Sequence, residues 1–442
     1  MSESIPRVVC VPFGYPDYPK DAVARRIAES TAALSSMGMD VIVCPAVIAR
    51  EDVERAVDVL RRERSDVIIA VLVSWVEPPV LMAVLRPFQH HPVVLWSHTT
   101  FVEDGSLVTL GALPAAGVIR ETLEEMGFRF AFTYGMPGDA RVDADISIFA
   151  RAAAAARALL DSRIALFGYA SMGIYTGTIS HTQLRAQLGP EVEHFDQYTL
   201  VQAYEQVTDD EIEPLLGETD RWQMRESVTP QSLRASLRMC AALKRLAALG
   251  PYDALTVKCQ YELSRSLGVT PCIALSMLAD EMVVSCEGDV PLVVTQLMLH
   301  YLSGGTTSYG DLHHVTSREV WFGACGFAPF SQAAGRPIVT QHTALYDGLC
   351  NSSRYREGRV TLARLGAEGA GFKMHLAAGK TVPVPEFHEV GCPPYPLIAV
   401  ELSGSTDDFM QNLVSQHYGF CYGDVSAELR ALCRLLGVTV IE

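Results

Sequence analysis

The 442-residue sequence predicts two Rossmann-like α/β domains followed by a C-terminal, barrel-like domain rich in β-strands. Three observations lead to this fold class. Up to about Asp311, short apolar runs alternate with segments of helical spacing, which is typical of a parallel sheet covered on both faces. A fresh strand-like run begins at Arg163, directly after an alanine-rich helix. Beyond Asp311, short β-prone runs between Gly and Pro replace the alternation and favour an antiparallel barrel or sandwich.

These changes of pattern divide the chain into three expected domains, residues 1–161, 162–311 and 312–442. The first domain is expected to contain strands Val8–Pro12, Asp40–Cys44, Asp66–Val73 and His91–Trp96, and helices Tyr18–Met37, Glu51–Arg62 and Ile148–Asp161. The second is expected to contain strands Arg163–Gly168, Ala254–Lys258 and Met282–Cys286, and helices Thr178–Leu188, Pro230–Leu249, Cys272–Ala279 and Pro291–Leu302. The third is expected to contain strands Glu319–Gly323, Arg359–Arg364, Lys380–Val384 and Leu397–Leu402, and helices Phe409–Gln416 and Val425–Leu435.

Composition narrows the kind of partner. The net charge of −16 opposes binding to nucleic acid and to anionic membranes, and no cluster of Lys and Arg interleaved with aromatic residues occurs. No apolar run reaches the roughly 18–20 residues that span a bilayer. The eleven cysteines include several within apolar runs, where a reduced thiol behaves as a small hydrophobe. A cytoplasmic protein with a small-molecule partner is expected.

Nucleotide and nucleophile motifs are incomplete. The run Gly168–Gly173 follows a strand, but it lacks the second glycine of a dinucleotide motif and the Gly-Lys ending of a phosphate loop. Tyr169 also stands where a nucleophile elbow needs its first glycine. A tight turn that lines a pocket is the better interpretation of Ser171.

Two acids and one histidine are the strongest candidates for chemistry. Glu287 follows the strand-like run ending at Cys286, and Asp311 ends a Gly-rich segment, so each acid is expected to close an element and open a turn. His417 lies in an aromatic, Gly-punctuated stretch after a predicted helix. From spacing alone, a helix-terminal charge, a turn aspartate and a core or loop histidine are the simpler explanations of these residues, and a role in chemistry stays open beside them.

Several segments in order resemble the L-fucose isomerase and L-arabinose isomerase family, with the closer likeness to the fucose isomerase branch. The 24-residue separation of Glu287 and Asp311, with Asp289 two places after the glutamate, is similar to that branch's acid pair. Ser171-Met-Gly-Ile174, Ser74-Trp75 and the C-terminal His417 also match in position. The likeness implies a sugar substrate and a three-domain subunit that assembles into a homo-oligomer, a trimer or hexamer with sites between subunits.

The resemblance also implies an aldose–ketose isomerase acting on a pentose or 6-deoxyhexose. Glu287, Asp311 and His417 would hold a divalent metal, and the two acids would exchange a proton with an enediolate. Two carboxylates and an imidazole leave about three octahedral positions open and favour Mn²⁺, with Mg²⁺ or another divalent ion as alternatives. Trp75, Met172 and Gln260 are expected to contact the sugar.

The sequence departs from the family where the arabinose branch has a metal-binding histidine, because Ala324 stands there in Trp321–Gly326. We therefore expect three protein ligands, unless His342 provides a fourth. The residues after Asp289 differ from the family as well, which leaves the sugar open. Alternatives are a non-catalytic sugar-binding protein on the same scaffold, and an epimerase or lyase that uses the same enediolate chemistry.

Overall fold

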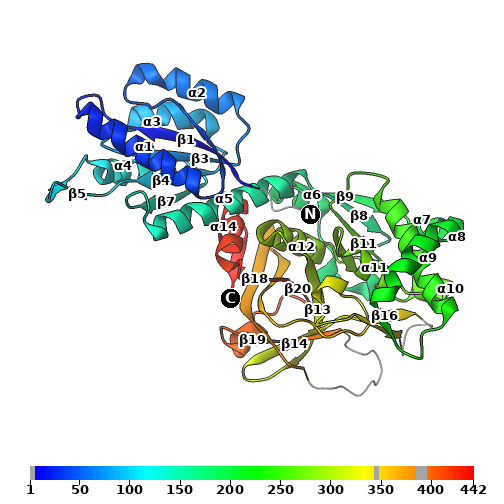
Figure 1. The fold of residues 1–442 in the computed structure, drawn as a ribbon. Helices are drawn as coiled ribbons and strands as arrows, with labels where there is room; N and C mark the ends of the chain where they lie inside the picture. Colours follow the sequence, from blue (N-terminus) through cyan, green and yellow to red (C-terminus); the bar gives the residue numbers. More distant parts are fainter. Residues whose placement is uncertain (1–4, 343–347, 385–395) are drawn as a thin grey trace. The chain divides into compact units, whose positions relative to one another are not determined.

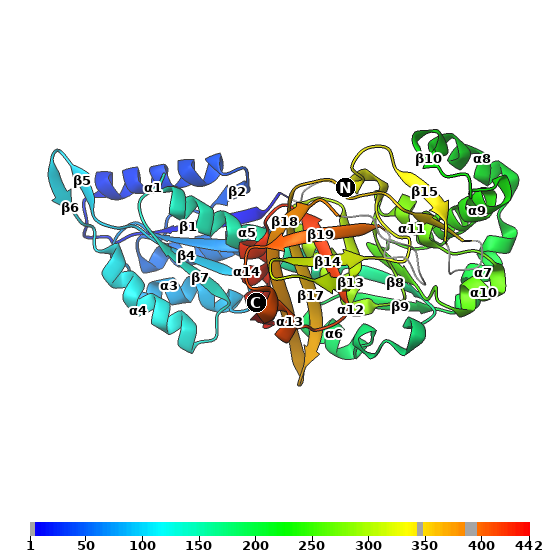
Figure 2. The same cartoon turned by 90° about the horizontal axis from the view of Figure 1, so that it is seen from below.

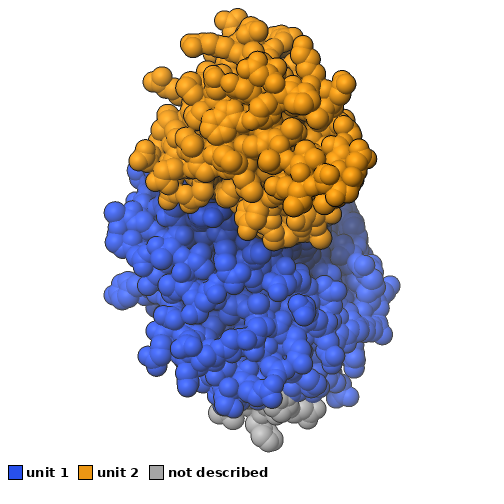
Figure 3. Space-filling view, turned by 90° about the vertical axis from the view of Figure 1, so that its left-hand side faces the viewer, with its two compact units in different colours: residues 1–3, 158–442 blue, residues 4–157 orange. Residues whose placement is uncertain are grey.

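The computed structural model describes residues 5–342, 348–384 and 396–442 (Figure 1). The chain divides into two compact units, which we call the N-terminal unit, residues 4–157, and the C-terminal unit, residues 158–442 (Figure 3). Helix α5, Ala140–Asp161, contains both this division and the boundary expected at residue 161. In the described segments, no helix combines the length and the apolar character that crossing a membrane requires.

The N-terminal unit contains a parallel five-stranded sheet with the order β2-β1-β3-β4-β7. Apolar residues of α2, α3 and α4 pack on one face of this sheet, and α1 lies on the other (Figure 2). The strands are β1 Arg7–Phe13, β2 Asp40–Val43, β3 Val67–Leu72, β4 Val93–Ser97 and β7 Phe130–Tyr134, beside the hairpin β5 Phe101–Glu103 and β6 Ser106–Val108. The helices are α1 Lys20–Ser36, α2 Val53–Arg62, α3 Pro78–Leu85 and α4 Ala112–Glu125. Strands buried on both faces explain the continuous apolar runs of the sequence.

The C-terminal unit begins with a second parallel sheet, ordered β12-β11-β8-β9. Its strands are β8 Arg163–Phe167, β9 Glu191–Phe195, β11 Ala254–Val257 and β12 Val283–Cys286. Its helices are α6 His181–Gln187, α7 Gln197–Gln206, α8 Asp209–Glu218, α9 Pro230–Ala247, α10 Glu262–Leu267 and α11 Cys272–Leu278. A small sheet joins β10 Gln223–Met224, β15 Ile338–Gln341 and β16 Leu349–Asn351. The sequence patterns missed β9, whose five residues include two glutamates and a histidine.

The rest of this unit is a closed barrel of six strands in the order β17-β20-β13-β14-β19-β18, with β21 added to the edge of β18. The strands are β13 Thr307–Val315, β14 Glu319–Gly323, β17 Arg359–Glu368, β18 Gly371–Val382, β19 Leu397–Leu402, β20 His417–Tyr422 and β21 Thr439–Ile441. Pairing of β17 with β18 closes the barrel, which decides between the barrel and the sandwich that the sequence left open. Helices α13 Thr406–Gln411 and α14 Ser426–Leu436 follow β19 and β20.

Helix α12, Val290–Ser303, joins the parallel sheet to the barrel. It contacts β12 of the sheet and β13, β17 and β20 of the barrel, and it lies between the two in Figure 1. Because both sides of the helix are covered, nearly all of its residues are buried and it is apolar all round. The loop that precedes α12 therefore lies where the carboxyl end of the sheet meets the barrel wall.

Candidate metal centre

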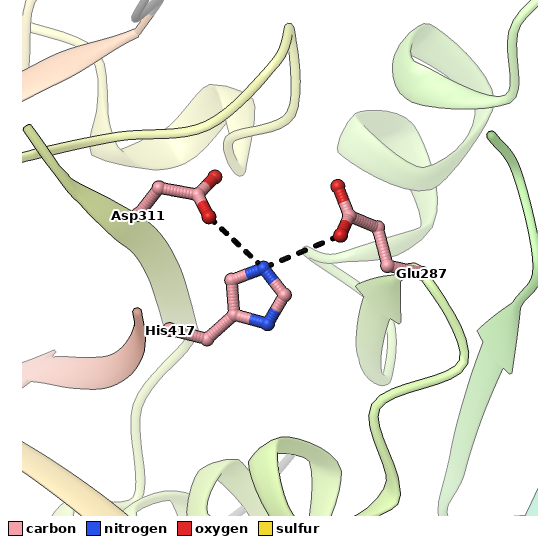
Figure 4. A group of neighbouring side chains, drawn as sticks. All are labelled: Glu287, Asp311 and His417. Carbon is pink, nitrogen blue, oxygen red and sulfur yellow. Dashed lines mark ion pairs between the residues drawn. The ribbon is translucent and has the colours of Figure 1, made fainter. Parts of the chain in front are cut away.

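Glu287, Asp311 and His417 come together at this junction of sheet and barrel (Figure 4). Each offers one ligand atom, and these atoms lie within 4.8 Å of one another. The Nε2 atom of His417 is 3.1 Å from Oδ1 of Asp311 and 3.4 Å from Oε2 of Glu287. Among the described residues this is the only such group of three or more His, Cys, Asp or Glu side chains.

Strand pairing sets the positions of Asp311 and His417. The two residues are direct partners in the antiparallel pair of β13 and β20, and side chains directly opposite on neighbouring strands are about 4.5–5.5 Å apart at Cβ. The expectation that Asp311 opens a turn was wrong, because it lies inside β13. The helix expected over Phe409–Gln416 ends at Gln411, and His417 is the first residue of β20 rather than a loop residue.

A tight turn directs Glu287 toward these strands. Glu287 and Gly288 follow β12 with φ angles of 70° and 65°, so two successive residues adopt the left-handed conformation. A Cβ atom on Gly288 would lie 2.2 Å from the backbone oxygen of Tyr169. The amide of Ser171 donates to the Glu287 carbonyl over 2.8 Å. The Gly168–Gly173 segment therefore packs against the loop of Glu287 and Gly288, which we call the acid loop, and fixes its backbone.

Asp289 and Arg364 hold the histidine from behind. The Nδ1 atom of His417 lies 2.7 Å from Oδ2 of Asp289, and Arg364 donates to the same oxygen over 2.9 Å. Asp289 Oδ1 accepts from the amide of Leu292 and thereby caps α12. Burial would raise the pKa of Asp289, but the Arg364 charge and the hydrogen bond from His417 outweigh burial and lower this pKa to about 2. An ionised Asp289 keeps the proton of His417 on Nδ1 and turns Nε2 toward the two acids.

The surroundings of the Nε2 atom of His417 fit a site for a cation. It is buried, and neither carboxylate contact has the geometry of a hydrogen bond among the described residues. Burial would lower the pKa of His417, but the negative charge of Asp311 and the hydrogen bond to Asp289 raise it well above its ordinary value. Two carboxylates facing one buried nitrogen thus favour a positive charge between them. A proton or a divalent metal ion can supply that charge.

Other residues near the centre include three that the sequence reasoning did not assign to the site: Tyr309, Arg364 and Cys325. The buried Tyr309 ring meets His417 edge-on at 5.3 Å, and its hydroxyl has no hydrogen-bond partner in the described chain. The thiol of Cys325 lies 3.7 Å from Oε1 of Glu287. Arg364 could have been noticed as a single charge inside an apolar strand pattern.

The remaining predicted residues are distributed over both units. Gln260 is buried and donates to the Cys325 thiol over 2.9 Å, so it reaches the centre through that residue. Met172 is 48% exposed, one residue beyond the contact between Ser171 and Glu287. Trp75 belongs to the N-terminal unit, where its amide donates to Leu110. His342 is not part of the three-residue ligand group, and Ala324 is buried.

The centre and the comparisons with known proteins together define an enzyme of the aldose–ketose sugar isomerase class. The relatives are sulfoquinovose isomerases. Those from Priestia aryabhattai and Priestia megaterium are each 23% identical over 417 residues, which covers 89% of this chain and 91% of each relative. The one from Alkalicoccus urumqiensis is 24% identical over 364 residues, covering 79% of this chain and 80% of that protein. The expected class of sugar isomerases is thus confirmed, while the fucose isomerase branch stays a prediction.

No family model matches the sequence. Among solved structures, a solute-binding protein of an ABC transporter from Agrobacterium vitis, bound with alpha-D-tagatopyranose, is 12% identical. The match covers 68% of this chain and 90% of that chain, with a TM-score of 0.17, and an overlap this low supports no conclusion.

Proposed function

We propose that this enzyme interconverts an aldose and its ketose by moving a proton between adjacent carbons through an enediolate. Glu287, Asp311 and His417 would hold a divalent metal, with Mn²⁺ preferred because two of the three ligands are hard carboxylate oxygens. The observation that carries this proposal is the buried Nε2 of His417, which faces two carboxylates and makes no hydrogen bond to any residue that the structure describes. When bound, the metal supplies positive charge that stabilises the enediolate as negative charge develops on the sugar oxygens.

The two carboxylates differ in access to solvent, which suits them to different parts of the proton transfer. The Glu287 side chain is 4% exposed, whereas that of Asp311 is 26% exposed. A proton taken up by Glu287 would exchange slowly with water, whereas a proton on Asp311 would exchange readily. We assign the carbon-bound proton to this pair, and deuterium exchange reports which acid takes it.

For the substrate, we propose a hexose that carries an anionic group at C6. Three relatives are named for sulfoquinovose, a 6-deoxy-6-sulfonate of glucose, and they match most of this chain. This proposal narrows the expectation of a pentose or 6-deoxyhexose. Met172 and Gln260 stay candidates for contacts with the sugar, because both lie next to residues that touch Glu287.

We retain the homo-oligomer, a trimer or hexamer, as part of the proposal, with Trp75 contributed to the centre of a neighbouring subunit. Its support is the resemblance to fucose isomerases in the Ser74-Trp75 position. Light scattering coupled to size-exclusion chromatography measures the oligomeric state directly. A monomeric active enzyme would refute this part and leave the chemistry of the centre intact.

The test of the function uses protein freed of metal with a chelator and reloaded with Mn²⁺. With sulfoquinovose in D₂O, NMR is expected to show ketose formation, with deuterium at C1 of the ketose and at C2 of the recovered aldose. Glucose, L-fucose and L-arabinose serve as comparison substrates. Glu287→Gln keeps the side-chain volume and removes one carboxylate of the pair, so turnover should fall at least about 100-fold. Glu262→Gln changes an exposed side chain of α10 and should leave turnover unchanged. Absence of both metal binding and exchange with every sugar would sink the proposal.

A further inference from the structure

We propose that Cys325 is a positioning residue for Glu287, a role that rests on the proposed function of the centre. Glu287 presents its two oxygens to different neighbours. Oε2 faces Nε2 of His417 at 3.4 Å, and Oε1 lies 3.7 Å from the Cys325 thiol, within reach of an S–H donor. The thiol thus holds the oxygen that points away from the histidine.

The direction of this contact follows from the second partner of the thiol. The side-chain amide of Gln260 donates to Sγ of Cys325 over 2.9 Å, so the sulfur is already an acceptor there. The S–H proton is then free to point to Oε1 of Glu287, which as a carboxylate only accepts. Gln260, Cys325 and Glu287 form a one-way chain of donors, and all three are at least nine-tenths buried.

The backbone around Cys325 is fixed independently of this chain. The thiol of Cys272 donates to the Cys325 carbonyl over 3.2 Å, and the amide of Asn351 donates to the next carbonyl, that of Gly326, over 2.9 Å. Gly326 has a φ of +105°, and a Cβ there would lie 2.3 Å from the Cβ of Cys350. The thiol therefore starts from a rigid position.

A thiol suits this role because it is a weak donor. It orients the carboxylate without forming the short, strong hydrogen bond that a hydroxyl makes to a charged oxygen. In the run Trp321–Gly326, Ala324 stands where a histidine ligand was expected. The next residue, Cys325, instead orients the ligand Glu287.

The test compares Cys325→Ala and Cys325→Ser with Cys240→Ala, which removes another fully buried thiol of the same unit far along the chain on α9. Cys325→Ala is expected to lower Mn²⁺ affinity, measured by calorimetry, and kcat by roughly ten-fold each, with KM changed less than two-fold. Cys325→Ser keeps a donor and should recover part of both losses, whereas Cys240→Ala should change neither. Equal effects of the two Cys325 variants, or wild-type affinity and kcat in Cys325→Ala, would overturn the role.

A second measurement does not depend on turnover. The S–H stretching band that disappears in Cys325→Ala is expected to move to higher frequency in Glu287→Gln, because an amide oxygen is a weaker acceptor than a carboxylate. An unmoved band in metal-free protein would also overturn the hydrogen bond. Failure of the unmodified protein to bind Mn²⁺ refutes the proposed metal centre, whereas normal Mn²⁺ binding with an unmoved band refutes only the role of Cys325.

Discussion

Replacing Asp289 by Asn tests how the histidine of the centre is held. Asp289 is buried and joins Arg364 at 2.9 Å to His417 at 2.7 Å. Asparagine has the same size and caps helices as well as aspartate does, so the cap of α12 should survive. What the substitution removes is the negative charge between two buried partners.

The expected loss of stability follows from Arg364, whose side chain is 0% exposed. Removing one partner of a buried pair leaves the other charge uncompensated and costs about 3–5 kcal/mol. Asp209 offers the matched control, because it pairs with Arg234 at 3.0 Å on the surface, with 71% of its side chain exposed. Asp209→Asn should change stability by about 1 kcal/mol or less.

The assay is urea unfolding of the metal-free proteins, followed by circular dichroism, with Mn²⁺ affinity measured by calorimetry. Asp289→Asn should also lower that affinity by about 10–100-fold, because an amide no longer fixes the proton of His417 on Nδ1. The double variant Asp289→Asn with Arg364→Met removes both charges and should recover part of the stability. If Asp289→Asn unfolds no more easily than Asp209→Asn and binds Mn²⁺ as the wild type does, the reasoning is refuted.

Three further predictions concern the acid loop and pH. Gly288→Ala should lower the free energy of unfolding in urea by several kcal/mol more than Gly268→Ala. The φ angles of the two glycines are 65° and 64°, but among the described residues only a Cβ on Gly288 meets a neighbour, the backbone of Tyr169. Equal losses of stability would contradict the clash. Because the pKa of His417 is raised in the folded protein, protonation of His417 stabilises the metal-free protein fully below about pH 6.5, and this stabilisation is lost as pH rises through the raised pKa. Mn²⁺ should therefore increase the melting temperature more at pH 9 than at pH 6. The reverse order would count against His417 as a ligand. Because the pKa of Asp289 is lowered in the folded protein, ionised Asp289 contributes stability above pH 3.8 that is lost as pH falls toward about 2. In Asp289→Asn the melting temperature should therefore fall less steeply over this acid range.

Sequence patterns located the acids and the histidine but gave the wrong local structure for Asp311. Glu287 follows a buried strand, as its position after an apolar run predicted. Asp311 and His417 lie inside barrel strands, although the Gly-rich segment before Asp311 suggested a turn there. Glycine is tolerated at these points because a neighbour approaches closely, as Phe322 does at Gly310. Local composition cannot distinguish such a close approach from a turn.

The sequence by itself determined the alternating α/β pattern, the position of α12 and three side chains suited to a hard metal, because periodicity and ligand chemistry are local properties. Only the tertiary structure decided that the last strands close into a barrel and that Asp311 pairs with His417 across 106 positions of the chain. The same folding buries Asp289 and Arg364 as counter-ions and brings the Cys325 thiol to Glu287. These partners are far apart in sequence, so their contacts depend on strand register and packing.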